Sequence, residues 1–290
     1  MSKIRIQSFF DPVTHTVTYV VADVASGLAA VIDPVLDYDP ASGVISDTQI
    51  NRVIAFLDRE GLNLEWILET HVHADHLSAA HLLRQRRGGS IGIGEHIRRV
   101  QSTFKGRFNL PDDFPCDGSQ FDHLLADGEV ITVGHVDITV LHTPGHTPAC
   151  VSYHIEDAVF VGDTLFMPDY GTARTDFPDG SAKTLHRSIS KLLALPPSTR
   201  MFVGHDYLPE GREDYAWETT VMEQKRSNIH VHDGVSATDF IQQRESRDAT
   251  LGAPRLLLPA LQVNIRAGQL PPAESNGVRY LKLPLSGLDV

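Results

Sequence analysis

Three histidines and an aspartate stand within six positions in Thr70-His-Val-His-Ala-Asp-His-Leu-Ser-Ala79. A run typical of a strand, residues 64–69, leads directly into this stretch. In an extended segment residues i and i+2 point the same way, so His71 and His73 can face one centre. A helix predicted over residues 77–87 would carry Asp75 and His76 near its first turn, where a carboxylate is favoured. Side chains at the ends of strands in α/β proteins converge on ligands.

Further polar residues follow other predicted strands. His146 lies in the turn His142-Thr-Pro-Gly-His-Thr-Pro148, Asp163 follows the apolar run 158–162, and His205 follows the run 201–204. One histidine after a strand is usually a surface or hydrogen-bonding residue. Burying the whole cluster without partners would be costly, so a metal site is the better interpretation. The set needs no thiolate, which favours a harder metal than sites built from cysteine.

Strands alternate with helices along the chain. Strands are predicted over residues 16–23, 28–33, 64–69, 90–94, 129–133, 136–142, 151–155, 158–161 and 200–203. The first helix is predicted to begin near Ser46, because Ser46 and Gln49 have capping-box spacing. Further helices are predicted over residues 77–87, 182–195, 218–226 and 238–244. Gly61 is expected to end the first helix. Two halves that each begin with strands suggest two sheets flanked by helices.

Composition narrows the class of protein. The chain has 290 residues, 41% of them hydrophobic, which indicates one wide globular domain or a domain with an added lobe. A formal net charge of −12 argues against a nucleic-acid partner. No apolar stretch approaches the roughly 20 residues that span a bilayer, and no secretory signal opens the chain. The two cysteines suit a reducing compartment, so we expect a cytoplasmic protein without a membrane partner.

The set His71-x-His73-x-Asp75-His76, His146, Asp163 and His205 resembles the metallo-β-lactamase superfamily. The resemblance covers most of residues 1–225. It implies an α/β (α+β) fold, the four-layer αββα sandwich, with a C-terminal helical and extended tail. Residues 1–225 would form the metallo-β-lactamase-like domain, and residues 226–290 an extension packed on it. A fold that hosts many chemistries does not fix the reaction.

Two further stretches, Gly162-Asp-Thr-Leu-Phe166 and Gly171-Thr-Ala-Arg-Thr-Asp-Phe177, resemble the persulfide dioxygenases, the mononuclear iron branch of the superfamily. Arg247-Asp248 and the tail resemble the bacterial β-lactamase-like hydrolase subgroup. The chain has Thr172 and Ala173 where many dioxygenases have a cysteine and a second glycine. It also has Asn228-Ile-His230 where many relatives have Asn-Pro.

This resemblance implies an iron-dependent oxidoreductase. His71, His146 and Asp163 would hold one Fe(II) per chain, a facial triad with three open positions. The substrates would be glutathione persulfide and O2, and the products sulfite and glutathione, as in sulfide detoxification. His73, Asp75, His76 and His205 would orient ligands and waters. In the alternative, a glyoxalase II-like thioester hydrolase, the same four residues would help to bind the second of two zinc ions.

Arg174 and Tyr207 are the candidates for substrate binding. A guanidinium can hold a carboxylate through two hydrogen bonds, and glutathione has two carboxylates. The competing interpretation of Arg174 is a salt bridge with Asp176. Cys150 is interpreted as a buried structural thiol. The tail beyond residue 225 is a candidate for a homodimer contact or a lid.

Overall fold

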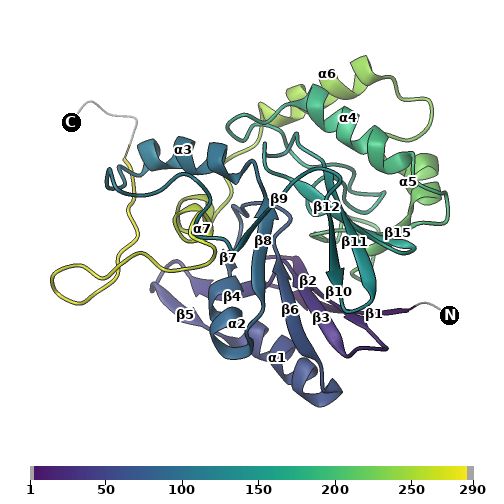
Figure 1. Ribbon diagram of the computed structural model, residues 1–290. Coiled ribbons are helices and arrows are strands. Elements are labelled where there is room, and N and C mark those ends of the chain that lie inside the picture. Colours follow the sequence, from purple (N-terminus) through teal and green to yellow (C-terminus); the bar gives the residue numbers. More distant parts are fainter. Residues whose placement is uncertain (1–2, 286–290) are drawn as a thin grey trace.

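Two six-stranded sheets face each other in the computed structural model, which describes residues 3–285 (Figure 1). The first sheet has the order β1-β2-β3-β6-β8-β9, with bounds Ile4–Asp11, Thr16–Asp23, Leu28–Ile32, Asn63–Leu68, Ser90–Gly94 and His123–Leu125. The second has the order β10-β11-β12-β13-β14-β15, with bounds Val130–Val133, Val136–His142, Val151–Ile155, Ala158–Phe160, Arg200–Phe202 and Glu218–Thr220. A small third sheet joins β5, β4 and β7, with bounds Val44–Ser46, Val35–Asp39 and Leu77–Ser78.

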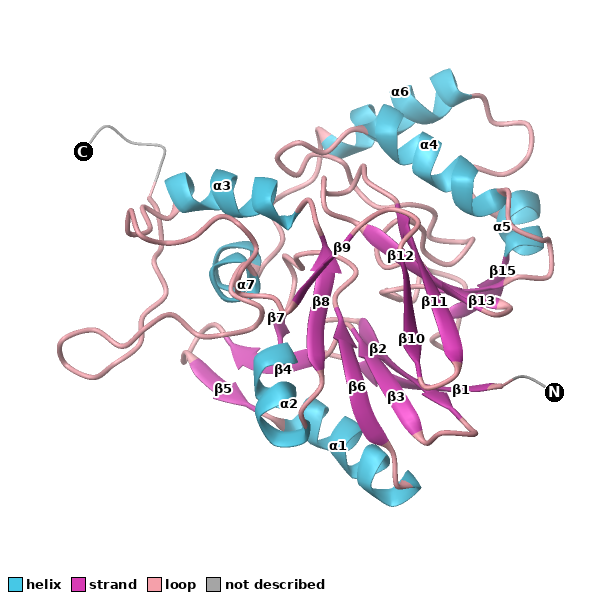
Figure 2. Cartoon of the chain, in the orientation of Figure 1, coloured by secondary structure: helices cyan, strands magenta, loops and turns pink. Residues whose placement is uncertain are grey.

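Helices cover the outer faces of the two large sheets (Figure 2). Those described are α1 (Thr48–Glu60), α2 (Ala80–Arg87), α3 (Ile97–Arg107), α4 (Ala182–Leu193), α5 (Val221–Ser227), α6 (Ala237–Asp248) and α7 (Leu257–Asn264). The first sheet packs against α1 and α2, and the second against α4 and α5, while α6 packs on α4. Among the described residues no helix is both long and apolar enough to cross a bilayer.

Three apolar interiors separate the four layers. Val31 and Ile67 of the first sheet pack with Phe56 of α1, and Leu185 of α4 packs with Val159 of the second sheet. A third interior lies between the sheets and contains Tyr19, Tyr153 and Phe160. Strands near the middle of the sheets, such as β3 and β13, are wholly apolar because both of their faces are covered. The structure is therefore the four-layer αββα sandwich that the sequence predicts.

The start of α1 differs from the prediction. Ser46 does not cap this helix, because β5 pairs it with Asp37 of β4 and holds it extended. The helix begins at Thr48, and its N-cap residue, Asp47, makes no side-chain capping bond. Instead, the carboxylate of Asp37 accepts a hydrogen bond from the amide of Gln49 at 3.0 Å. A neighbouring strand thus supplies the acceptor that the capping-box spacing assigned to Ser46. Gly61 ends the helix in a left-handed conformation, as predicted.

The predicted helix over residues 77–87 is also too long at its start. Leu77 and Ser78 form β7, which pairs with β4, and α2 begins only at Ala80. Asp75 and His76 therefore lie in a loop rather than on the first turn of a helix. The helices α3 and α7 were not predicted. The proposed division at residues 225 and 226 stays a prediction.

Candidate metal centre

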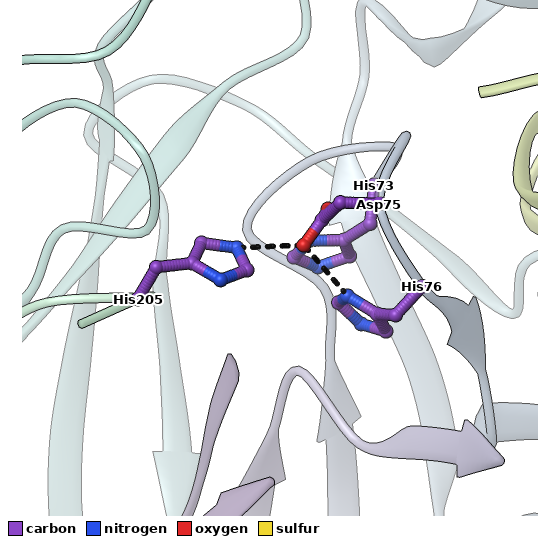
Figure 3. Close-up of side chains that lie close together, drawn as sticks. All are labelled: His73, Asp75, His76 and His205. Atoms are coloured by element: carbon purple, nitrogen blue, oxygen red, sulfur yellow. Dashed lines mark ion pairs between the residues drawn. The ribbon is translucent and has the colours of Figure 1, made fainter. Parts of the chain in front are cut away.

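The histidines and aspartates of the predicted cluster come together at one edge of the two sheets. Loops that follow β6, β11, β13 and β14 supply them. Two groups of ligand atoms result, each within 4.8 Å: one comprises His71, His146 and Asp163, and the other His73, Asp75, His76 and His205. His71 and His73 have rings only 4.1 Å apart but belong to different groups. Figure 3 shows Asp75 between His205 and His76.

The first group has its imidazoles oriented by hydrogen bonds on Nδ1. Thr70 Oγ1 donates to Asp33 Oδ2 at 2.8 Å and lies 3.0 Å from His71 Nδ1. Because this hydroxyl already donates its only proton to Asp33, it accepts a hydrogen bond from His71 Nδ1–H. His146 Nδ1 likewise donates to the carbonyl of Arg174 at 2.8 Å. The Nε2 lone pairs of both histidines are therefore free, and each Nε2 lies 3.8 Å from Asp163 Oδ2.

A glycine allows the loops of this group to approach each other. Gly162 has φ +50, and a Cβ there would lie 2.5 Å from Thr70 Oγ1. Any larger residue would displace Thr70 or the loop that carries Asp163. Gly162 therefore allows the Asp163 carboxylate to lie beside His71.

The second group is tightly packed as well. His205 Nε2 lies 3.2 Å from Asp75 Oδ2 and 3.3 Å from Asp163 Oδ1. Asp163 thus adjoins both groups through its two oxygens. Thr16 Oγ1 lies 3.3 Å from His76 Nδ1 and 3.4 Å from His205 Nδ1, which leaves Nε2 of both rings directed away from it.

His73 is held from outside the cluster. Its Nε2 lies 3.0 Å from Asp33 Oδ1 and 3.3 Å from Glu69 Oε2. Burial alone would lower the pKa of His73, but these two carboxylates raise the pKa well above its ordinary value. Neither ring nitrogen of His73 has a hydrogen-bond partner of suitable geometry within the described residues. Asp33 and Glu69 were not singled out from the sequence, because each is a lone acid at a strand end.

Buried atoms without partners show that the cluster suits a metal ion. Within residues 3–285 no hydrogen bond of suitable geometry reaches the following atoms: His71 Nε2, His73 Nδ1, His76 Nε2, Asp75 Oδ2, Asp163 Oδ1 and His205 Nε2. Each such buried group costs about 1–3 kcal/mol. A cation bound by these imidazole and carboxylate atoms would remove that cost, and the donor set suits zinc or iron.

Comparison with known proteins agrees with this geometry. The sequence model of the metallo-beta-lactamase superfamily matches residues 11–205. The chain belongs to the metallo-beta-lactamase superfamily. Among superfamily members, "Beta-lactamase hydrolase-like protein" of Xylella fastidiosa is 51% identical over 98% of this chain, which spans 65% of that relative. "Glyoxylase B2" of Dictyostelium discoideum is 50% identical over 99% of both chains.

More distant superfamily members include proteins named for persulfide oxidation. "Persulfide dioxygenase ETHE1, mitochondrial" of Homo sapiens is 30% identical over 91% of this chain and 89% of its own. The crystal structure of ETHE1 from Myxococcus xanthus has a TM-score of 0.72 and 31% identity, and it covers 91% of this chain and 100% of its own. The chain is thus a metal-binding member of a superfamily of enzymes.

A cavity of about 350 Å³ opens beside the first group of this superfamily site. His146 and Asp163 line it together with three arginines, Arg244, Arg247 and Arg255. Arg244 is bound to Asp248 at 2.7 Å. No hydrogen bond or ion pair within the described residues engages the guanidinium groups of Arg247 and Arg255. Sequence alone places Arg247 only in the tail, because its approach to the cavity depends on how α6 packs.

The two predicted substrate-binding residues also line this cavity. Tyr207 stacks on His205 with ring centroids 5.5 Å apart. Arg174 forms the salt bridge weighed as its alternative, with two 2.6 Å hydrogen bonds to Asp176. Its remaining Nη1 donates to the carbonyl of Gly252 at 2.8 Å. Arg174 is therefore occupied within the protein, whereas Arg247 and Arg255 are free to bind an anion.

The two cysteines lie outside the cluster. Cys150 is buried, and its Sγ accepts a hydrogen bond from the amide of Thr147 at 3.3 Å. Burial raises the pKa of this thiol to about 12, so it stays protonated. This agrees with the structural role predicted for Cys150. His142 lies 3.0 Å from the carbonyl of Pro148 and belongs to neither metal-ligand group.

Proposed function

We propose that this chain is a persulfide dioxygenase in which His71, His146 and Asp163 hold one ferrous ion. The observation that supports it most is the grouping of these three ligand atoms within 4.8 Å, with Nδ1 of both imidazoles already engaged. Two histidines and one carboxylate form the ligand set of many non-haem iron oxygenases. The similarity to the human persulfide dioxygenase adds support.

The proposed reaction converts glutathione persulfide, O2 and water to glutathione, sulfite and two protons. The S–S bond breaks, the outer sulfur is oxidised, and O2 is the oxidant. Iron held by the triad would supply open positions and electron density for O2. Arg247 and Arg255 would bind the carboxylates of glutathione, which fixes the sulfur end toward His146. Tyr207, Arg174 and the packed histidines would limit the entry of water.

A two-zinc thioester hydrolase of the glyoxalase II kind is the second candidate. It is favoured by the second group of ligands, in which Asp75, His76 and His205 stand next to Asp163. The relative named Glyoxylase B2 supports it too. In that case Asp163 would help to hold both ions, which would supply a hydroxide nucleophile near neutral pH.

Metal analysis and oxygen consumption test the first proposal. Protein purified without added metal is expected to contain about one iron per chain and to take up O2 with glutathione persulfide while sulfite forms. The substitution His146→Ala should abolish iron binding and oxygen uptake. His154→Ala, in β12 and outside the ligand groups, serves as the control. Iron or activity retained by His146→Ala would contradict the ligand assignment.

An assay with S-lactoylglutathione separates the two candidates. Hydrolysis of this thioester by protein with two zinc ions per chain, at a rate independent of O2, would favour the hydrolase. We further propose that the enzyme acts in the cytoplasm, where a reducing environment preserves both free thiols and ferrous iron. The homodimer stays a prediction, which a sedimentation experiment would test.

A further inference from the structure

His230 lies on the wall of the cavity, away from the metal ligands. It follows α5 in the chain and is 7% exposed. The cavity wall at this point also contains Thr172, Arg244 and Arg247. The ring packs against Gly171, which has φ +97 and where a Cβ would lie 2.2 Å from His230 Nδ1. Gly171 therefore makes room for the imidazole.

The hydrogen bonds of His230 determine which ring nitrogen carries the proton. The backbone amide of Thr172 donates to Nδ1 at 3.0 Å. A peptide nitrogen cannot accept a hydrogen bond, so Nδ1 must present its lone pair. In the neutral ring the proton is then on Nε2. No residue in 3–285 forms a hydrogen bond with that Nε2–H.

The surroundings of His230 keep the ring neutral. Burial lowers its pKa to about 4, and the nearby Arg244 and Arg247 act in the same direction, against Asp248. All three charged residues belong to α6. At neutral pH His230 consequently offers one uncharged N–H group beside a free guanidinium, in a chain with a net charge of −12. A local excess of donors and positive charge is suited to an anion.

We propose that His230 is a substrate-positioning residue whose Nε2–H donates a hydrogen bond to a carboxylate of the substrate, next to Arg247. The proposal rests on the proposed function, because glutathione persulfide supplies the carboxylate. This donor would contribute to substrate specificity through the carboxylate that it binds. It reaches no metal ligand and performs no bond-breaking step.

Two substitutions separate the two ring nitrogens. His230→Asn keeps an acceptor near the position of Nδ1 for Thr172 but removes the donor at the Nε2 position. His230→Gln places an amide N–H near the Nε2 position instead. Calorimetric titration of the metal-loaded protein with glutathione should show a dissociation constant at least about tenfold higher for His230→Asn than for the wild type. His230→Gln should recover part of the lost affinity. The KM for glutathione persulfide should rise by a similar factor, with kcat nearly unchanged.

Further measurements exclude a merely structural effect. The ratio of the KM of His230→Asn to the KM of the wild type should stay constant from pH 6 to pH 8, because His230 is neutral throughout this range. The ¹⁵N chemical shifts of the wild type should identify Nδ1 as the unprotonated nitrogen. His186→Asn is the matched control, since His186 contacts Phe240 and lies outside the cavity wall. It should bind glutathione like the wild type.

The proposal is overturned if His230→Asn binds glutathione as tightly as the wild type, or if Nδ1 proves to be protonated. A fall in kcat at constant KM would also overturn it. Failure of the proposed function looks different. If glutathione persulfide drives no O2 uptake, but glutathione binding still depends on the donor of His230, the dioxygenase is wrong and the role of His230 stands.

Discussion

The hydroxyl of Thr70 connects the buried carboxylate of Asp33 to the imidazole of His71. It donates to the first and accepts from the second, so it fixes both the tautomer and the ring orientation of a candidate ligand. The other oxygen of Asp33 forms an ion pair with His73, whose Nε2 lies 3.0 Å away. One carboxylate behind the cluster therefore orients two histidines that belong to different ligand groups.

The substitution Thr70→Val tests this role. Valine has nearly the same shape but leaves His71 Nδ1 and one oxygen of Asp33 without a partner. We expect metal affinity to fall by about 10- to 100-fold, measured by competition with a chelator. Thr219→Val is the matched control, because Thr219 is buried in the second sheet and bonds to Glu223. Equal affinities of Thr70→Val and wild type would contradict the tautomer assignment.

The segment from Leu251 to Arg255, here termed the strap, connects α6 to α7 and lines the cavity beside the site. Leu251 and Pro254 line the arginine-rich cavity and also a second cavity of about 230 Å³. Phe104, Phe177 and Leu257 line the second cavity as well. The guanidinium of Arg174 donates to the carbonyl of Gly252 in the strap. The backbone carbonyl of Arg174 accepts from His146 and orients its ring. The strap and a candidate metal ligand are thus fixed by the same residue.

Removing the carboxylate that holds Arg174 should loosen the strap. Asp176→Asn leaves the guanidinium without its ion pair, which is partly exposed and contributes up to about 1 kcal/mol. We expect hydrogen exchange at residues 251–256 to speed up by as much as about fivefold. Asp157→Asn breaks a similar pair with Arg200 far from the strap and should leave this exchange unchanged.

Helix α7 holds the loop of the cluster in place. Asn264 Nδ2 donates to the carbonyls of His73 and His76, both at 2.8 Å, and its Oδ1 accepts from the amide of Ser78 at 2.8 Å. These bonds explain why residues 74–76 form a loop and not the start of a helix. The C-terminal part of the chain therefore positions the loop of the candidate metal centre.

Replacing Asn264 by alanine should disturb the loop and the cluster together. The three lost hydrogen bonds leave buried carbonyl and amide groups unpaired, at about 1–3 kcal/mol each. We expect a lower melting temperature and weaker metal binding. Gln262→Ala, on the same helix, removes bonds to Lys282 and should loosen the tail without changing metal content. Unchanged metal affinity in Asn264→Ala would show that α7 does not support the metal-ligand loop.

At the scale of the whole molecule, the two sheets bring together loops that are far apart in the sequence. The buried atoms without partners belong to the loops of both halves, because His71 follows β6 of one sheet and His205 follows β14 of the other. A bound ion would connect the halves. Metal binding should therefore stabilise the complete sandwich and not only the local loops.

Metal removal measures this connection. At a metal concentration 1,000 times the dissociation constant, binding stabilises the folded state by about 4 kcal/mol. Each kcal/mol corresponds to roughly 2–4 °C in a domain of comparable size. We expect chelation to lower the melting temperature by about 10 °C and added metal to restore it. The double substitution His71→Ala and His146→Ala should abolish the response, and a persistent response would place the ion elsewhere.

The sequence alone was sufficient for features with a local cause. The period of apolar residues and the stop at Gly61 indicate α1, and the density of imidazoles between 71 and 76 indicates a metal site without any knowledge of the fold. Tertiary structure decided the features that depend on distant partners. Asp37 caps α1, Asn264 keeps Asp75 and His76 off a helix, and the Thr172 amide positions His230. Hydrogen bonds between segments far apart in the chain leave no periodic pattern in the sequence, because only the packing of the layers makes those segments neighbours.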